Sequence, residues 1–200
     1  MAATTSKAKK TGKKAKPAAK VETQKAWSGR HNYSLNSDTV LRDVYRLLNV
    51  VMADEAIARL ATARGDVLVD LRDQFVEDEL VHLLISTAIM NRSHDDHMDG
   101  PRNDAAELSF APVALACGRL VTDVGGTKED DIELTFREAC NKIIHAEHIT
   151  VETQKAKNAA FQFLPTTVQL RGTLRKKPWV AFVDVPNYVR ATLMNFRDLR

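Results

Sequence analysis

The chain has few cysteines, few aromatic residues and no long apolar run. Its only cysteines are Cys117 and Cys140, so a disulfide framework is excluded. No apolar stretch approaches the roughly 18 residues that a membrane-spanning helix needs, and the N-terminus lacks the apolar core of a secretory signal. We therefore expect no membrane association and a cytoplasmic location.

Several sequence motifs of enzymes are also missing. There is no glycine-rich phosphate loop, no nucleophile elbow and no HExxH pattern. Their absence disfavours ATP-dependent and metalloprotease functions. We expect neither a resident metal ion nor a cofactor.

The first thirty residues have an unusual charge balance. Residues 1–30 contain eight lysines and one arginine against a single glutamate, and they hold no bulky apolar residue between Met1 and Val21. Such a segment cannot bury enough surface to offset the entropy of ordering it, which predicts a disordered tail over 1–30. The tail is either a solubilising extension or a nonspecific nucleic-acid-binding arm. The lysines of such an arm are Lys7, Lys9, Lys10, Lys13, Lys14, Lys16 and Lys20.

The remaining residues, 31–200, are expected to form a single domain. They carry 20 basic and 25 acidic residues, and the 44% apolar content of the chain is enough for a core. Apolar residues at helical spacing predict two antiparallel helices, from about residue 37 to 64 and from 67 to 98. The buried stripe predicted for the second helix includes Leu68, Leu71 and Phe75, with Arg72 and Asp78 facing outward.

The pattern changes in the second half of the chain. Thr135 with Glu138 forms a capping box for a short helix over 136–146. Alternating residues then predict strands within 148–184, and a final helix covers 185–198. We read 125–131 as an exposed loop and leave 105–124 unassigned. The predicted class is α+β, with an antiparallel helical core, a small C-terminal antiparallel sheet and a final helix.

The short helix places three polar residues together. On a helical wheel Arg137, Asn141 and His145 lie within about 80° of one another, beside an apolar arc that includes Cys140. Lys142 is placed toward solvent. A histidine with a near-neutral pKa can move a proton during cleavage of an RNA phosphodiester, and an arginine can hold the phosphate. The stripe is therefore a candidate metal-independent ribonuclease site, and a purely structural polar stripe is the alternative.

The pattern Arg137…Asn141-x-x-x-His145, after two longer antiparallel helices, resembles the HEPN superfamily over residues 37–148. The resemblance implies a small helical domain, often a metal-independent endoribonuclease of toxin or phage-defence type. It also implies a homodimer whose Arg and His build a shared cleft, and an antitoxin as a further partner. Arg137 lies one turn earlier than the family's arginine, where this chain has Cys140. Non-catalytic members that bind a protein or nucleic acid give the alternative function.

Other residues compete as a site. The segment Arg92–His97 has an Arg-x4-His spacing and, together with Asp99, also fits a metal cluster. Glu79 and His82 form another ligand pair at helical spacing. Cys117, Cys140, His145 and His148 make a weak zinc set, because no CxxC pair accompanies them. For the Arg92–His97 segment we favour a solvated helix end, and we assign no metal ligand in the chain.

Overall fold

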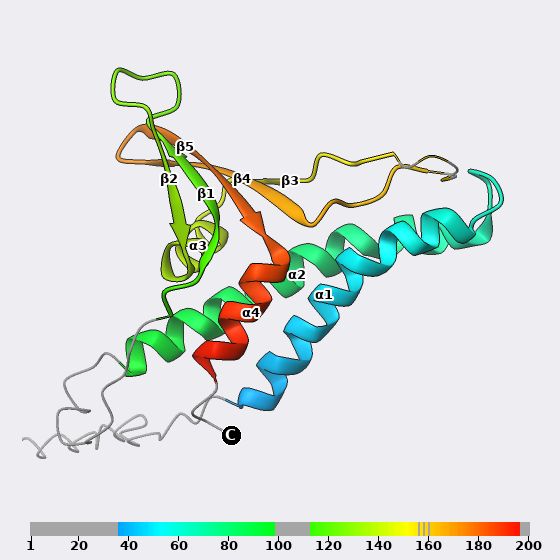
Figure 1. Ribbon diagram of the computed structural model, residues 1–200, viewed down its shortest axis with the longest axis horizontal. Coiled ribbons are helices and arrows are strands. Elements are labelled where there is room, and N and C mark those ends of the chain that lie inside the picture. The colour runs from blue at the N-terminus through cyan, green and yellow to red at the C-terminus, as the bar shows by residue number, and fades with distance from the viewer. Residues whose placement is uncertain (1–35, 99–112, 156, 158, 160, 197–200) are drawn as a thin grey trace, which may run out of the picture. The chain divides into compact units, whose positions relative to one another are not determined.

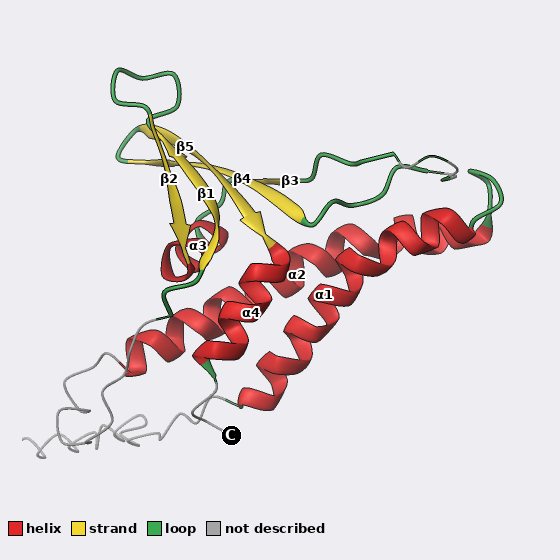
Figure 2. Cartoon of the chain, in the orientation of Figure 1, coloured by secondary structure: helices red, strands yellow, loops and turns green. Residues whose placement is uncertain are grey.

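The computed structural model describes residues 36–98, 113–155, 157, 159 and 161–196. The predicted tail and its seven lysines lie outside the described residues. Four helices and a five-stranded antiparallel sheet are described (Figures 1 and 2). In chain order they are α1 Ser37–Leu60, α2 Val67–Met98, β1 Ala116–Thr122, β2 Asp130–Thr135, α3 Phe136–Ile144, β3 His148–Thr150, β4 Thr167–Leu174, β5 Lys177–Asp184 and α4 Val185–Asn195. The predicted α+β class is confirmed.

The sheet has the strand order β2-β1-β5-β4-β3, and every neighbouring pair is antiparallel. It is larger than the sequence predicted, because the β1–β2 hairpin precedes the short helix. The residues left unassigned thus include β1, and β2 begins at the end of the predicted loop over 125–131. Gly118 explains part of this, since its φ of 138° accompanies a bulge in β1. A Cβ at this position would lie 1.9 Å from the carbonyl oxygen of Phe182, so only glycine fits.

The helix termini follow the local signals in the sequence. The side chain of Asn36 caps α1, and Thr135 caps α3 by accepting a hydrogen bond from the Glu138 amide at 3.4 Å. Asp184 caps α4 through the Asn187 amide at 2.8 Å. These contacts satisfy amides that otherwise lack a partner in the first turn.

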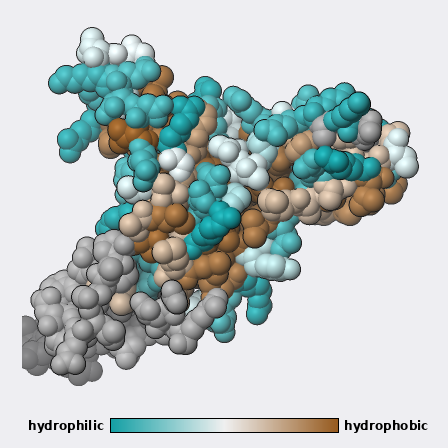
Figure 3. Space-filling view, viewed as in Figure 1, coloured by the Kyte–Doolittle hydropathy of each residue, from teal (hydrophilic) through white to brown (hydrophobic). Residues whose placement is uncertain are grey.

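The core lies where α1, α2, α3 and α4 meet one face of the sheet. Alternate residues of β4 and β5 point into it, among them Val168, Leu170, Trp179, Ala181 and Val183. In the view of Figure 3, hydrophilic residues cover the β1–β2 end of the sheet. Hydrophobic residues reach the surface along the helices, where Tyr45 is 66% exposed and Met52 is 55% exposed.

The prediction for the first half of α2 was wrong. Leu68, Leu71 and Phe75 are exposed, whereas Arg72 turns inward to Asp54. The second half is as predicted, with Leu80, Leu83, Leu84 and Thr87 buried. Asp78 is exposed as predicted, and the residue of the first half that is buried in the core is Val69.

A buried polar network joins α2 to α4. The hydroxyl of Tyr188 lies 3.1 Å from Thr87 Oγ1, and Asn91 donates to it at 3.3 Å. Asn91 also donates to Thr192 Oγ1 at 2.9 Å and accepts from Asn195 Nδ2 at 3.2 Å. Burial raises the pKa of Tyr188 well above its ordinary value, so the phenol stays protonated.

Candidate functional site

The predicted polar stripe lies where α3 packs against the C-terminal part of α2. Phe136, Ala139, Cys140 and Ile143 are buried and fix the helix on the core. The opposite edge of α3 therefore turns toward α2, and it carries the polar residues. The polar stripe of α3 therefore faces side chains of α2.

Arg137 meets two carboxylates of α2. Its Nη2 lies 2.8 Å from Asp96 Oδ1, and its Nη1 lies 3.4 Å from Asp95 Oδ2. The Arg137 side chain is 41% exposed, so part of the guanidinium edge is open to solvent. The charge of this arginine is already balanced within the chain.

Asn141 joins α3 to Arg92 on α2. Arg92 Nε donates to Asn141 Oδ1 at 3.0 Å, and Asn141 Nδ2 donates to Glu138 Oε2 at 3.1 Å. Arg92 also pairs with Asp96. No local pattern in the sequence indicates this contact, because 49 residues separate its partners. Two segments that competed as separate sites are therefore one polar cluster.

His145 terminates α3 and is exposed. Its backbone amide donates to the Asn141 carbonyl at 3.0 Å. Among the described residues its imidazole has no hydrogen-bond partner. His148 does not continue the helical stripe, because it begins β3 opposite Arg171.

Lys142 corrects the expected orientation of α3. It was placed toward solvent, but it is 6% exposed. Its ammonium pairs with Glu138 at 3.3 Å and lies 4.7 Å from the centre of the Trp179 ring. The aliphatic stem is thus used for packing, while the charge keeps an acidic partner and an aromatic face.

The cluster as a whole is close to neutral. Three cations, Arg92, Arg137 and Lys142, face three carboxylates, Asp95, Asp96 and Glu138. Burial raises the pKa of Asp95, and the nearby guanidinium of Arg137 opposes this increase. A neutral cluster can hold its side chains in place, but it offers a phosphate less attraction than unpaired cations would.

The described residues do not support the hypothesis of a metal site. They contain no group of three His, Cys, Asp or Glu side chains that could hold a metal ion. His94 Nε2 lies 2.9 Å from the Asn195 carbonyl oxygen, and its ring stacks on Phe196 at 4.6 Å. Glu79 pairs with Arg46. The side chain of His97 and all of Asp99 lie outside the described part.

Both cysteines are buried. Burial raises the pKa of the Cys117 thiol to about 12, and it also raises the pKa of Cys140. A thiolate nucleophile is therefore disfavoured at neutral pH.

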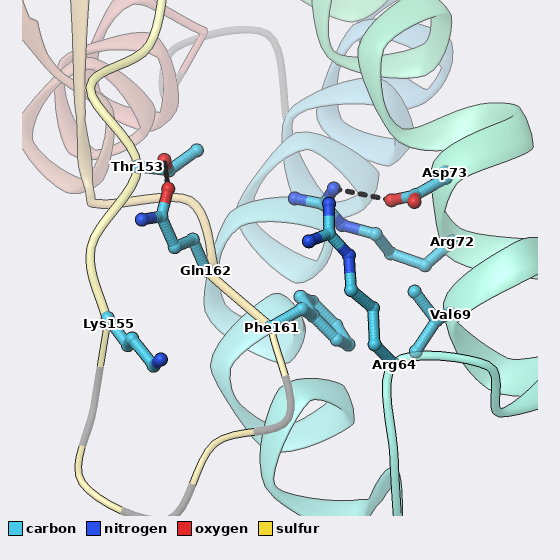
Figure 4. Close-up of a pocket in the computed structure, with 8 residues that line it drawn as sticks. All are labelled: Arg64, Val69, Arg72, Asp73, Thr153, Lys155, Phe161 and Gln162. Carbon is cyan, nitrogen blue, oxygen red and sulfur yellow. Dashed lines mark hydrogen bonds and ion pairs between the residues drawn. The ribbon is translucent and has the colours of Figure 1, made fainter.

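A cavity of about 380 Å³ lies at the other end of α2. Figure 4 shows Arg64 and Arg72 reaching toward the same region beside Phe161, with Lys155 on the facing loop. Arg72 lies 5.2 Å from the centre of the Phe161 ring and pairs with Asp54 and Asp73. Within the described residues, Arg64 and Lys155 have no acidic partner. The sequence did not suggest this cavity, because Phe161 and Arg64 are far apart in the chain.

No protein-family model, curated protein or solved structure matches the chain significantly. Among the described helices, none is both long enough and apolar enough to cross a bilayer.

Proposed function

We propose that this chain is a HEPN-like, metal-independent endoribonuclease that acts on RNA phosphodiesters, with His145 as the residue that moves the proton. The observation that supports this most is the hydrogen bond from Arg92 to Asn141. This bond brings a second guanidinium to Asn141, and Asn141 lies one helical turn before the exposed His145. Arg92 thus takes part of the role first given to Arg137.

The reaction needs one proton transfer at each of two oxygens. The 2′-hydroxyl loses its proton as its oxygen attacks phosphorus, and the departing 5′-oxygen gains one. The products are a 2′,3′-cyclic phosphate and a 5′-hydroxyl. His145 serves one of these transfers. Arg92 and Arg137 offset charge that develops on the phosphate oxygens, and Asn141 orients Arg92 through its bond at 3.0 Å.

The test is cleavage of a labelled single-stranded RNA in EDTA. His145→Ala should abolish formation of the cyclic phosphate, and Arg92→Ala and Arg137→Ala should reduce it, while the circular dichroism spectrum of each remains that of the wild type. His148→Ala is the matched control, because this exposed histidine lies only three residues away, in β3. Activity that requires added Mn²⁺ or Zn²⁺, or that survives His145→Ala, would contradict the proposal.

A second candidate function is RNA binding without cleavage. It is favoured by the paired charges of the α2–α3 cluster and by Arg64 and Lys155 beside Phe161, which have no acidic partner among the described residues. A base can stack on the phenyl ring while the cations contact phosphate. In this case wild-type protein binds RNA without cutting it. Arg64→Ala with Lys155→Ala should then weaken binding and flatten its salt dependence.

The proposal also includes a homodimer and, as an added partner, an antitoxin protein. A small antitoxin encoded beside this chain and copurifying with it would favour the toxin type. A copurified antitoxin should inhibit cleavage in the same RNA assay.

A further inference from the structure

A second cavity, of about 350 Å³, lies between α2 and the segment that continues from β3. Most of its lining is apolar, and this part consists of Val76, Leu80 and Val81 on α2 and Ile149, Val151 and Leu164 on the facing wall. We call these six residues the α2–β3 cleft. Clefts of about 300–1,000 Å³ that are largely apolar and have a few converging polar groups are the usual ligand sites of proteins.

The α2–β3 cleft adjoins the cavity that contains Phe161. Arg72 and Thr153 line both spaces, and Figure 4 shows them on facing sides. The residues of α2 that line the two spaces run from Val69 to Val81. This is a length of roughly 18 Å along the helix axis. The two cavities therefore form one elongated site.

Buried contacts hold the walls of this site in place. Asp54 accepts from Arg72 on one wall at 2.8 Å and from the Leu164 amide on the other at 2.7 Å. The same pairing balances the charge of Arg72. Gln154 and Phe163 exchange two backbone hydrogen bonds of 2.8 Å behind the facing wall. The site is therefore largely formed before any ligand binds, which lowers the cost of binding.

The two ends of the site differ in charge. Arg64 and Lys155 lie at the Phe161 end, and neither has an acidic partner among the described residues. Glu77 borders the opposite end, beside the apolar lining. An anionic group is therefore attracted to the Phe161 end and repelled from the other end.

We propose that this site binds a small anionic amphiphile, with its charged head beside Arg64 and Lys155 and its aliphatic body in the α2–β3 cleft. The apolar part, from Arg72 to Val81, is roughly 14 Å long and suits a decyl chain. An RNA strand fits this part poorly, because it carries a charge at every nucleotide and has no aliphatic body. The proposal does not depend on the nuclease activity, because binding is measured without RNA.

The first experiment titrates the full chain with sodium decanoate, below its micelle concentration, by isothermal calorimetry. Decanoate should bind at one site per chain. Acetate lacks the aliphatic body and decyltrimethylammonium has a cationic head, so each should bind at least about tenfold more weakly. Residues 31–200 hold 25 acidic and 20 basic side chains, so unspecific attraction would favour the cation instead. Equal or tighter binding of decyltrimethylammonium, or a wild type that does not bind decanoate, overturns the proposal.

The second experiment tests the head and the body of the site separately. Arg64→Gln with Lys155→Gln should weaken decanoate binding by about tenfold or more, as expected for the loss of a charge-assisted hydrogen bond. Val76→Trp and Val151→Trp fill the cleft from opposite walls, and each should abolish binding. Two variants are used so that one remains informative if the other unfolds in thermal melts.

Leu71→Ser is the matched control. Leu71 is 58% exposed on the same helix and lines neither cavity, so this variant should bind decanoate as the wild type does. Binding that survives in a folded tryptophan variant, or that Leu71→Ser removes, would place the amphiphile on the outer surface of α2 and overturn the proposal. So would RNA binding that needs Arg64 and Lys155 in a chain that does not bind decanoate.

Discussion

Asp54 joins three segments of the chain and offers the sharpest stability test. Its side chain is 1% exposed, and it accepts from Arg72 Nε at 2.8 Å, from Arg72 Nη2 at 2.9 Å and from the Leu164 amide at 2.7 Å. Asp54→Ala removes three acceptor contacts and leaves a partly buried guanidinium without its main partner. We expect it to lower the free energy of unfolding by about 3–5 kcal/mol.

The assay is urea denaturation with a double-variant comparison. For a domain of this size the loss corresponds to a fall in Tm of about 6–20 °C. Asp54→Leu combined with Arg72→Leu removes both charges and leaves mainly the Leu164 amide unpaired. It should therefore cost only about 1–3 kcal/mol.

The neighbouring pair Glu55–Arg59 is the control. Its side chains are 43% and 58% exposed, so Glu55→Ala should cost about 0.5 kcal/mol or less. A loss below about 1 kcal/mol for Asp54→Ala would refute the reasoning. So would a double variant less stable than Asp54→Ala alone.

Three further predictions concern thiols, a turn and a carboxyl. Because burial raises the pKa of Cys117 to about 12 and also raises that of Cys140, both thiols should react with a thiol reagent only after unfolding; rapid labelling of native protein would contradict this. Arg175 and Lys176 have φ values of 51° and 68° in the β4–β5 turn, a backbone conformation that Asn and Gly adopt more easily. Arg175→Asn with Lys176→Gly should therefore raise the free energy of unfolding by roughly 0.4–1 kcal/mol, measured as a higher urea midpoint. Because folding raises the pKa of Asp95, this carboxyl contributes most to stability below pH 3.8. The contribution is lost as the pH rises through the pKa that Asp95 has in the folded protein. Wild type should therefore lose stability relative to Asp95→Asn over that pH range, and an opposite trend in pH-dependent melts would show that the Arg137 pair outweighs burial.

Local signals predicted the helix starts well, because a cap and its first turn are neighbours in sequence. Thr135 caps the helix that it was expected to begin, and Asn36 and Asp184 cap α1 and α4 close to the predicted starts at residues 37 and 185. The β1–β2 hairpin was missed because Gly118 interrupts the alternating pattern, and the bulge that accommodates it is visible only when β1 lies between β2 and β5.

The two-sided character of α2 explains why its inner face was misassigned. Leu68, Leu71 and Phe75 satisfy helical periodicity as well as Leu80, Leu83 and Leu84 do, so spacing alone cannot say which set meets the core. The decisive contact is Arg72 with Asp54, across eighteen residues. At the candidate site the sequence grouped Arg137, Asn141 and His145 on one edge. It could not show that Arg92, Asp95 and Asp96 of α2 join this edge in one nearly neutral cluster.

The network between α2 and α4 also has a consequence for how the chain folds during synthesis. Thr87 and Tyr188 are 101 residues apart, and His94 and Asn195 are separated by the same number. Until α4 leaves the ribosome, Thr87, Asn91 and His94 lack these partners, and the inner face of α2 stays partly open. Such distant contacts close slowly, because a long loop must be ordered before they form. Final consolidation of the core should therefore wait for the last helix, and chains truncated before residue 185 should bind chaperones that recognise exposed apolar surface.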